Sequence, residues 1–111
     1  MTKELGKIEK VTFGLGNYQE CMLGIHFVFS GASWGVSDSR SAWDAERIEC
    51  SEYAKWTEAD RSKQYDEIMR YISKVLSDAK VDSIDQLKGK PVEATFEDRV
   101  LKSWRILTEV L

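Results

Sequence analysis

The sequence predicts an α+β fold in which an antiparallel sheet of about four to five strands, built as two hairpins, carries one long amphipathic helix on one face. Apolar residues alternate in two N-terminal and two C-terminal runs, with the two-residue period of half-buried strands. Between these runs, residues 57–80 carry apolar side chains at three- and four-residue steps, the spacing of an amphipathic helix. The 111 residues are enough for one core and show no linker or repeat, so we expect a single domain over residues 1–111.

The first hairpin is expected near the N-terminus. Val11, Phe13 and Leu15 alternate with polar or small residues and predict one strand. In the second strand, 22–29, the odd-numbered residues share one face and the even-numbered residues share the other. The segment "GLGNYQE" between the two strands supplies turn residues. Gly24 lies in mid-strand, which indicates a close backbone approach or a bulge.

The helix and the second hairpin follow from capping and turn signals. Thr57 is the expected N-cap, with Asp60 at the third helical position in place of the Glu or Gln of a capping box. Ser83 and Gln86 form a second capping signature, which predicts one helical turn. Pro91 opens a strand, and after a polar turn the next strand is expected to add to the same apolar face. The residues expected on that face are Val92, Ala94, Phe96, Val100, Trp104 and Ile106.

Residues 30–55 carry few periodic signals, and we expect them to be the irregular part of the chain. A short strand at 47–50 and irregular structure packed by its own aromatic residues both fit this pattern. Within it, "SGASWGVSDSRSAWDAE" places hydroxyls, a carboxylate and a guanidinium between two tryptophans. Each tryptophan also fits core packing. The candidate ligand- or partner-binding residues are Trp34, Ser37, Asp38, Ser39, Arg40 and Trp43.

These residue types suit two kinds of partner. Arg40 could clamp a phosphate or carboxylate while an aromatic ring stacks on a base. The same side chains would serve a protein interface, where Trp, Tyr and Arg form binding hot spots. The formal net charge of −3 argues against a general nucleic-acid coat, which needs a basic excess to displace counterions. An acidic protein can instead steer towards a basic surface.

Catalytic signals are weak, and we expect a non-enzymatic protein without metal or cofactor. His26 is the single histidine and has no partner that spacing requires, so a packed or surface role fits it better than catalysis. No CxxC or HxxxH spacing indicates zinc. The "GLG" at 14–16 lacks the third glycine and the lysine of a phosphate loop, so a hairpin turn explains it.

The cellular setting is expected to be the cytoplasm. The N-terminal "MTKELGKIEK" has no apolar segment of a secretory signal, and the longest apolar run, 21–29, is too short to cross a bilayer. In that compartment Cys21 and Cys50 should be thiols. The second face of the strand at 22–28 is apolar and one helix covers only one face, so a homo-oligomer is expected.

The chain resembles a group of small bacteriophage and prophage proteins that carry no functional name. The resemblance rests on "GNYQE" at 16–20, "WGVSD" at 34–38, Trp43, "KWTEADR" at 55–61, "YISKVL" at 71–76 and the ending "GKPVEATFEDRVLKSWRILTEVL". Where the group has a glycine-rich, more aromatic stretch after Asp38, this chain has "SRSA". No catalytic residues can be transferred from the resemblance.

What the resemblance implies is a phage protein acting by binding in the host cytoplasm. The expectation is an antagonist of a bacterial antiviral defence system, which either inhibits a host defence protein or sequesters a small anionic nucleotide signal. The alternative is a nucleic-acid-associated replication or recombination accessory protein, suggested by "LKGKPVEATFE".

Overall fold

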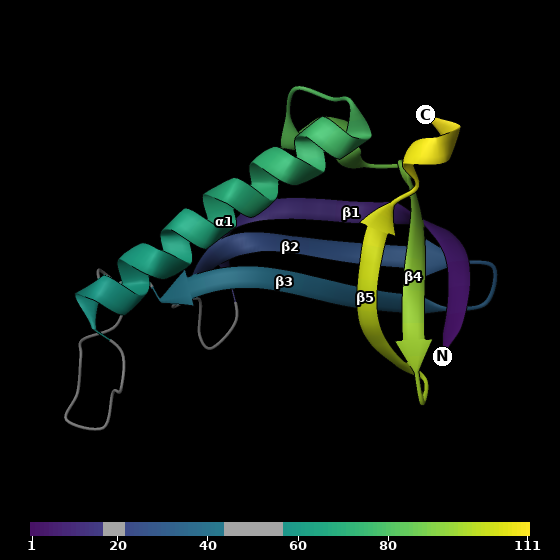
Figure 1. Cartoon of the computed structure of the whole chain (residues 1–111), viewed down its shortest axis with the longest axis horizontal. Coiled ribbons are helices and arrows are strands. Elements are labelled where there is room, and N and C mark those ends of the chain that lie inside the picture. Colours follow the sequence, from purple (N-terminus) through teal and green to yellow (C-terminus); the bar gives the residue numbers. More distant parts are fainter. Residues whose placement is uncertain (17–21, 44–56) are drawn as a thin grey trace.

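The computed structural model describes residues 1–16, 22–43 and 57–111 (Figure 1). Five antiparallel strands form one sheet in the order β3-β2-β1-β4-β5, with one long helix packed against it. This confirms the predicted α+β fold. The elements are β1 Thr2–Gly16, β2 Met22–Gly31, β3 Gly35–Trp43, α1 Glu58–Ala79, the 3-10 turn η2 Ile84–Leu87, β4 Pro91–Glu97, β5 Val100–Ile106 and the 3-10 turn η3 Thr108–Val110.

Strand β1 is longer than its alternating pattern predicts, because a bulge changes its register. Its pairing with β2 is continuous except for a shift between Ile8 and Lys10. Ile8 and Val11 are three positions apart and would point to opposite faces of an unbroken strand. The extra residue of the bulge, Glu9, lets both pack on the concave face of the sheet. The same shift brings Lys7 and Lys10 to the opposite, convex face.

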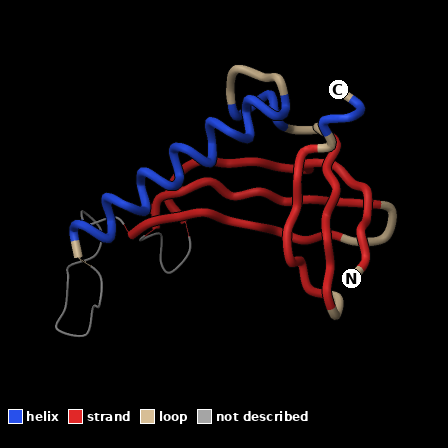
Figure 2. Tube along the Cα trace, viewed as in Figure 1, coloured by secondary structure: helices blue, strands red, loops and turns tan. Residues whose placement is uncertain are grey.

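The sheet curls because different parts of β1 pair with two different strands. The first part of β1, Thr2–Lys7, pairs with β4, whereas the part from Gly6 to Gly16 pairs with β2. Figure 2 shows the two later strands crossing over β1–β3 on the side that carries the helix. Trp104 of β5 thereby contacts Phe27 and Phe29 of β2, with ring centroids 4.9 and 4.5 Å apart. The buried core fills this concave side: Ile8, Ile25, Phe27, Phe29, Val75, Ala79, Leu87, Val92 and Ile106.

Helix α1 lies over the concave face and begins with the predicted cap. The Asp60 N–H donates to the Thr57 hydroxyl at 3.2 Å, and the Thr57 N–H donates to the Asp60 carboxylate at 2.9 Å. The helix ends at Ala79, and Lys80 caps it in a left-handed backbone conformation with φ of 58°. The apolar spacing of the helix includes Met69, but this side chain is 64% exposed. Met69 lies at the edge of the apolar stripe, where it lines a pocket with Ile68, Phe13 and Leu23.

Strand β3 corrects the prediction that residues 30–55 are irregular. Residues Gly35–Trp43 pair with β2 along their whole length as an edge strand. The two-residue period of β3 is not visible as alternating hydrophobicity, because the concave face carries two charged side chains and the convex face carries serines. On the concave face lie Val36, Asp38, Arg40 and Ala42; on the convex face lie Ser37, Ser39 and Ser41. The expected strand at 47–50 lies outside the described residues.

The second hairpin forms as predicted, with one change of face. A register shift between Thr95 and Phe96 turns Leu101 towards the core and leaves Val100 67% exposed, so the prediction for Val100 was wrong. The hairpin turn consists of Asp98 and Arg99, both with positive φ. Within the described ranges, no helix is long and apolar enough to cross a membrane.

Candidate binding site

A side-chain hydrogen bond joins the two edge strands of the sheet. Trp104 of β5 donates its indole Nε1–H to the Asp38 carboxylate of β3, over 2.9 Å. The strands are at opposite ends of the sheet order, and the curl of the sheet brings them together. We call the gap between β3 and β5, on the concave side, the seam.

A polar pocket of about 370 Å³ opens at the seam, beside α1. This volume lies within the range of small-molecule sites. We call it the seam pocket, and its lining comes from three elements far apart in the sequence. The lining residues are Asp38, Ser39 and Arg40 of β3, Tyr71 of α1, and Lys102, Ser103 and Trp104 of β5.

Two cations contribute to the seam pocket in different ways. The Arg40 guanidinium carbon lies 4.7 Å from the centroid of the Tyr71 ring, a cation–π contact that fixes the direction of the side chain. The Lys102 ammonium lies 3.1 Å from the Glu97 carboxylate, and both side chains are about half exposed. An exposed ion pair of this kind contributes little free energy, so Lys102 can exchange Glu97 for an anionic ligand at small cost.

Tyr71 is a hydroxyl donor at physiological pH. Burial raises the pKa of Tyr71 to about 12, with a further increase from the negative charge of Asp38. The charge of Arg40 and hydrogen bonding from Trp104 and Arg40 act in the opposite direction. Because the phenol stays protonated far above neutral pH, the seam pocket keeps a neutral O–H group next to the Arg40 guanidinium.

The six predicted binding residues do not converge on one site. Asp38, Ser39 and Arg40 line the seam pocket. The Ser39 hydroxyl, however, lies 2.8 Å from Nδ1 of His26, on the convex face. Strand alternation also places Ser37 on that face. Trp43 ends β3, and its side chain is outside what the structure describes.

Trp34 lies in a second pocket at the turn between β2 and β3. Its indole packs close to the backbones of Gly6 and Gly31, where any side chain would collide with it. The Trp34 and Phe96 rings are nearly perpendicular, with centroids 5.3 Å apart. These rings form two walls of a pocket of about 560 Å³, which we call the corner pocket.

The sequence offered no signal for the α1 and β5 residues of the seam pocket. Trp104 was predicted as a core residue, and its ring does contact the core, while its indole N–H reaches Asp38. Tyr71 is next to Ile72 in the helix, and its position in the sequence does not distinguish it from a packing residue. Only the curl of the sheet places Lys102 within reach of β3.

No protein-family model, no curated protein and no solved structure matches this chain. The described residues contain no group of three or more His, Cys, Asp or Glu side chains placed to hold a metal ion.

Proposed function

We propose that the protein binds a small anionic ligand in the seam pocket, without transforming it. The observation that carries the proposal is that Arg40 and Lys102, from opposite edges of the sheet, both line one polar pocket. An arginine fork recognises a phosphate or carboxylate geometrically, and a lysine adds a point charge. The Tyr71 hydroxyl supplies a neutral donor beside Arg40.

The same contacts support binding over catalysis. Asp38 accepts the Trp104 N–H, and Arg40 is stacked on Tyr71, so the polar groups of the seam pocket hold one another in fixed positions. Preorganised donors of this kind strengthen binding because little side-chain entropy is lost when the ligand enters. In the wider role that we propose, this phage-type protein counteracts a bacterial antiviral defence system by sequestering its nucleotide signal in the host cytoplasm. We favour a nucleotide over a host defence protein as the target because Arg40 lines a concave pocket and is held there by Tyr71.

The test is calorimetric titration of the protein with cyclic AMP and cyclic di-AMP, together with native mass spectrometry of protein from infected cells. We expect Arg40→Ala to weaken ligand binding at least tenfold, because a charged hydrogen bond contributes roughly 1.5–3 kcal/mol. The matched control is Arg70→Ala, because Arg70 is paired with Asp66 on the exposed side of α1. Equal affinity of the wild type and Arg40→Ala, or no anionic ligand in either experiment, would contradict the proposal.

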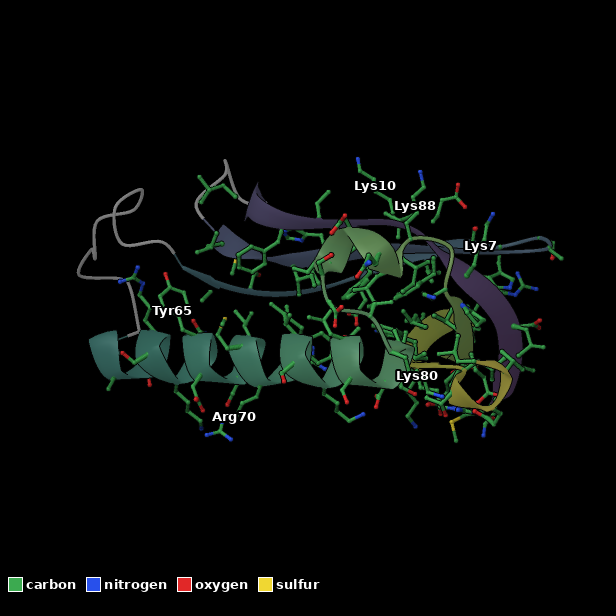
Figure 3. The ribbon with its side chains drawn as sticks, turned by 90° about the horizontal axis from the view of Figure 1, so that it is seen from above. Lys7, Lys10, Tyr65, Arg70, Lys80 and Lys88 are labelled. Carbon is green, nitrogen blue, oxygen red and sulfur yellow. The ribbon has the colours of Figure 1, made fainter. Side chains whose placement is uncertain are left out.

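A second candidate function, association with nucleic acid, is favoured by a separate group of lysines. Figure 3 shows Lys7, Lys10 and Lys88 pointing away from α1, on the convex side. Glu9 lies among them and pairs with Lys7 over 3.8 Å. For this function, we expect binding to single-stranded DNA to weaken steeply with salt, because phosphate contacts release counterions. An absence of binding at low salt would exclude it.

A further inference from the structure

We propose that the corner pocket is a second binding site, independent of the seam pocket, and that it takes a zwitterionic molecule with a flat apolar group. Its walls are the perpendicular Trp34 and Phe96 rings, and its volume of about 560 Å³ exceeds that of the seam pocket. The other lining residues are Thr2, Glu4, Ser33, Gly35, Val36 and Arg99.

Two opposite charges share the corner pocket without pairing. Glu4 of β1 and Arg99 of the β4–β5 turn both line it, and neither forms an ion pair in the described part of the chain. A purely anionic ligand would be repelled by Glu4, and a purely cationic ligand would be repelled by Arg99. A ligand with an ammonium and a carboxylate satisfies both side chains at once.

The strand pattern of β1 supports this assignment, because it is inverted at the pocket. Glu4 pairs with Ala94, which is fully buried, so Glu4 stands on the concave face where an apolar residue is expected. Its neighbour Leu5 stands on the convex face and is 64% exposed. Local violations of the apolar-inside pattern are typical of functional sites.

The backbone of Arg99 gives an independent observation. Arg99 is the second residue of a two-residue hairpin turn and has φ of 67°. Both central residues of such turns have positive φ, where glycine costs least and a long side chain is disfavoured. The chain therefore carries a guanidinium at a position where a glycine would be more stable. A role for that side chain in the corner pocket explains the strain.

The flat group of the ligand would lie against the aromatic corner. Trp34 is held by its close packing on Gly6 and Gly31, so it presents a rigid ring surface. Rigid aromatic walls add contact area without loss of side-chain entropy on binding. An aromatic amino acid is a small molecule with all three features.

The experiment measures L-phenylalanine binding by calorimetry, beside phenylpropionate, which lacks the ammonium, and phenethylamine, which lacks the carboxylate. We expect L-phenylalanine to bind at least tenfold more tightly than either analogue. Arg99→Gly should abolish the preference for L-phenylalanine over phenethylamine. It should also raise the melting temperature by about 4 °C, because it relieves a left-handed arginine.

Two further variants keep the test decisive. Asp98→Gly is the matched control, because it relieves positive φ at the preceding turn position while its side chain is not part of the corner pocket. It should leave binding unchanged. Glu4→Gln should remove the preference for L-phenylalanine over phenylpropionate. No binding of L-phenylalanine, or equal binding by the wild type and Arg99→Gly, would overturn the proposal.

Discussion

At the scale of single residues, two glycines of the sheet differ in the space around their Cα atoms. Gly24 was predicted to mark a close backbone approach, and the structure confirms it: an added Cβ would collide with the Arg40 carbonyl oxygen and lie 2.5 Å from the Ser41 Cα. Gly14, in the neighbouring strand, has open space in the same position. Two glycines in one sheet therefore serve different purposes, and only the contacts with β3 distinguish them.

We expect Gly24→Ala to lower the free energy of unfolding by more than about 2 kcal/mol, since the β3 backbone must shift to admit the methyl group. Gly14→Ala should be neutral or stabilising by about 0.5 kcal/mol, because alanine restricts the unfolded chain. Urea denaturation of both variants measures the difference. Similar midpoints for the two variants would show that β3 does not approach Gly24 closely.

Tyr71 gives a pH dependence that belongs to one side chain. Its pKa is raised to about 12 in the folded protein, above the ordinary value of 10. A raised pKa stabilises the folded state below the unfolded pKa, and that stability is lost as the pH rises through the folded pKa. Between pH 10 and 12, Tyr71→Phe should therefore lose less stability than the wild type. Thermal melts across this range measure it, and parallel losses would contradict the assigned environment.

At the scale of elements, apolar periodicity and capping signals predicted the half-buried segments correctly. Helix α1, the β4–β5 hairpin and the second strand follow from their apolar spacing. Strand β3 could not be predicted in this way, because its concave face carries Asp38 and Arg40 in place of aliphatic residues. The start of β1 was also missed, since the bulge at Glu9 breaks the two-residue period.

The N-cap of α1 is testable by itself. Thr57→Ala removes the hydroxyl that accepts the Asp60 N–H, and we expect a loss of about 1 kcal/mol in the free energy of unfolding. Thr57→Ser keeps the hydroxyl and should retain most of the stability. Thermal denaturation followed by circular dichroism measures both variants. Equal loss in both would indicate that threonine's methyl group, and not its hydroxyl, stabilises this end of the helix.

At the scale of the whole molecule, the curl of the sheet creates both candidate sites. The seam pocket needs β3 and β5 together, and the corner pocket needs the β2–β3 turn beside the β4–β5 turn. The hydrogen bond from Trp104 to Asp38 joins the two edges of the sheet. Its loss should therefore affect the global fold and the seam pocket together.

A double-mutant cycle measures this link. Trp104→Phe and Asp38→Ala should each destabilise the protein, and their combined loss should be smaller than the sum by about 1 kcal/mol or more, because the pair shares one interaction. Urea denaturation of the four proteins gives the coupling. Strict additivity would mean that the bond does not close the seam.

The expectation that the protein forms a homo-oligomer stays a prediction. The expected reason was an apolar second face of β2, and Val28 on that face is 38% exposed. Serines of β3 lie beside it, so the described convex face is mixed in character. Light scattering at several concentrations would decide between a monomer and a larger assembly.

By itself, the sequence determined the elements whose side chains alternate or repeat clearly: two hairpins, a capped helix and their common apolar face. It also named three residues of the seam pocket, since Asp38, Ser39 and Arg40 are adjacent in the chain. The tertiary structure decided the rest. Whether Asp38 on one edge strand meets Trp104 on the other depends on the twist and curl of the entire sheet. That curl arises from many strand pairings and from a bulge that no local pattern encodes.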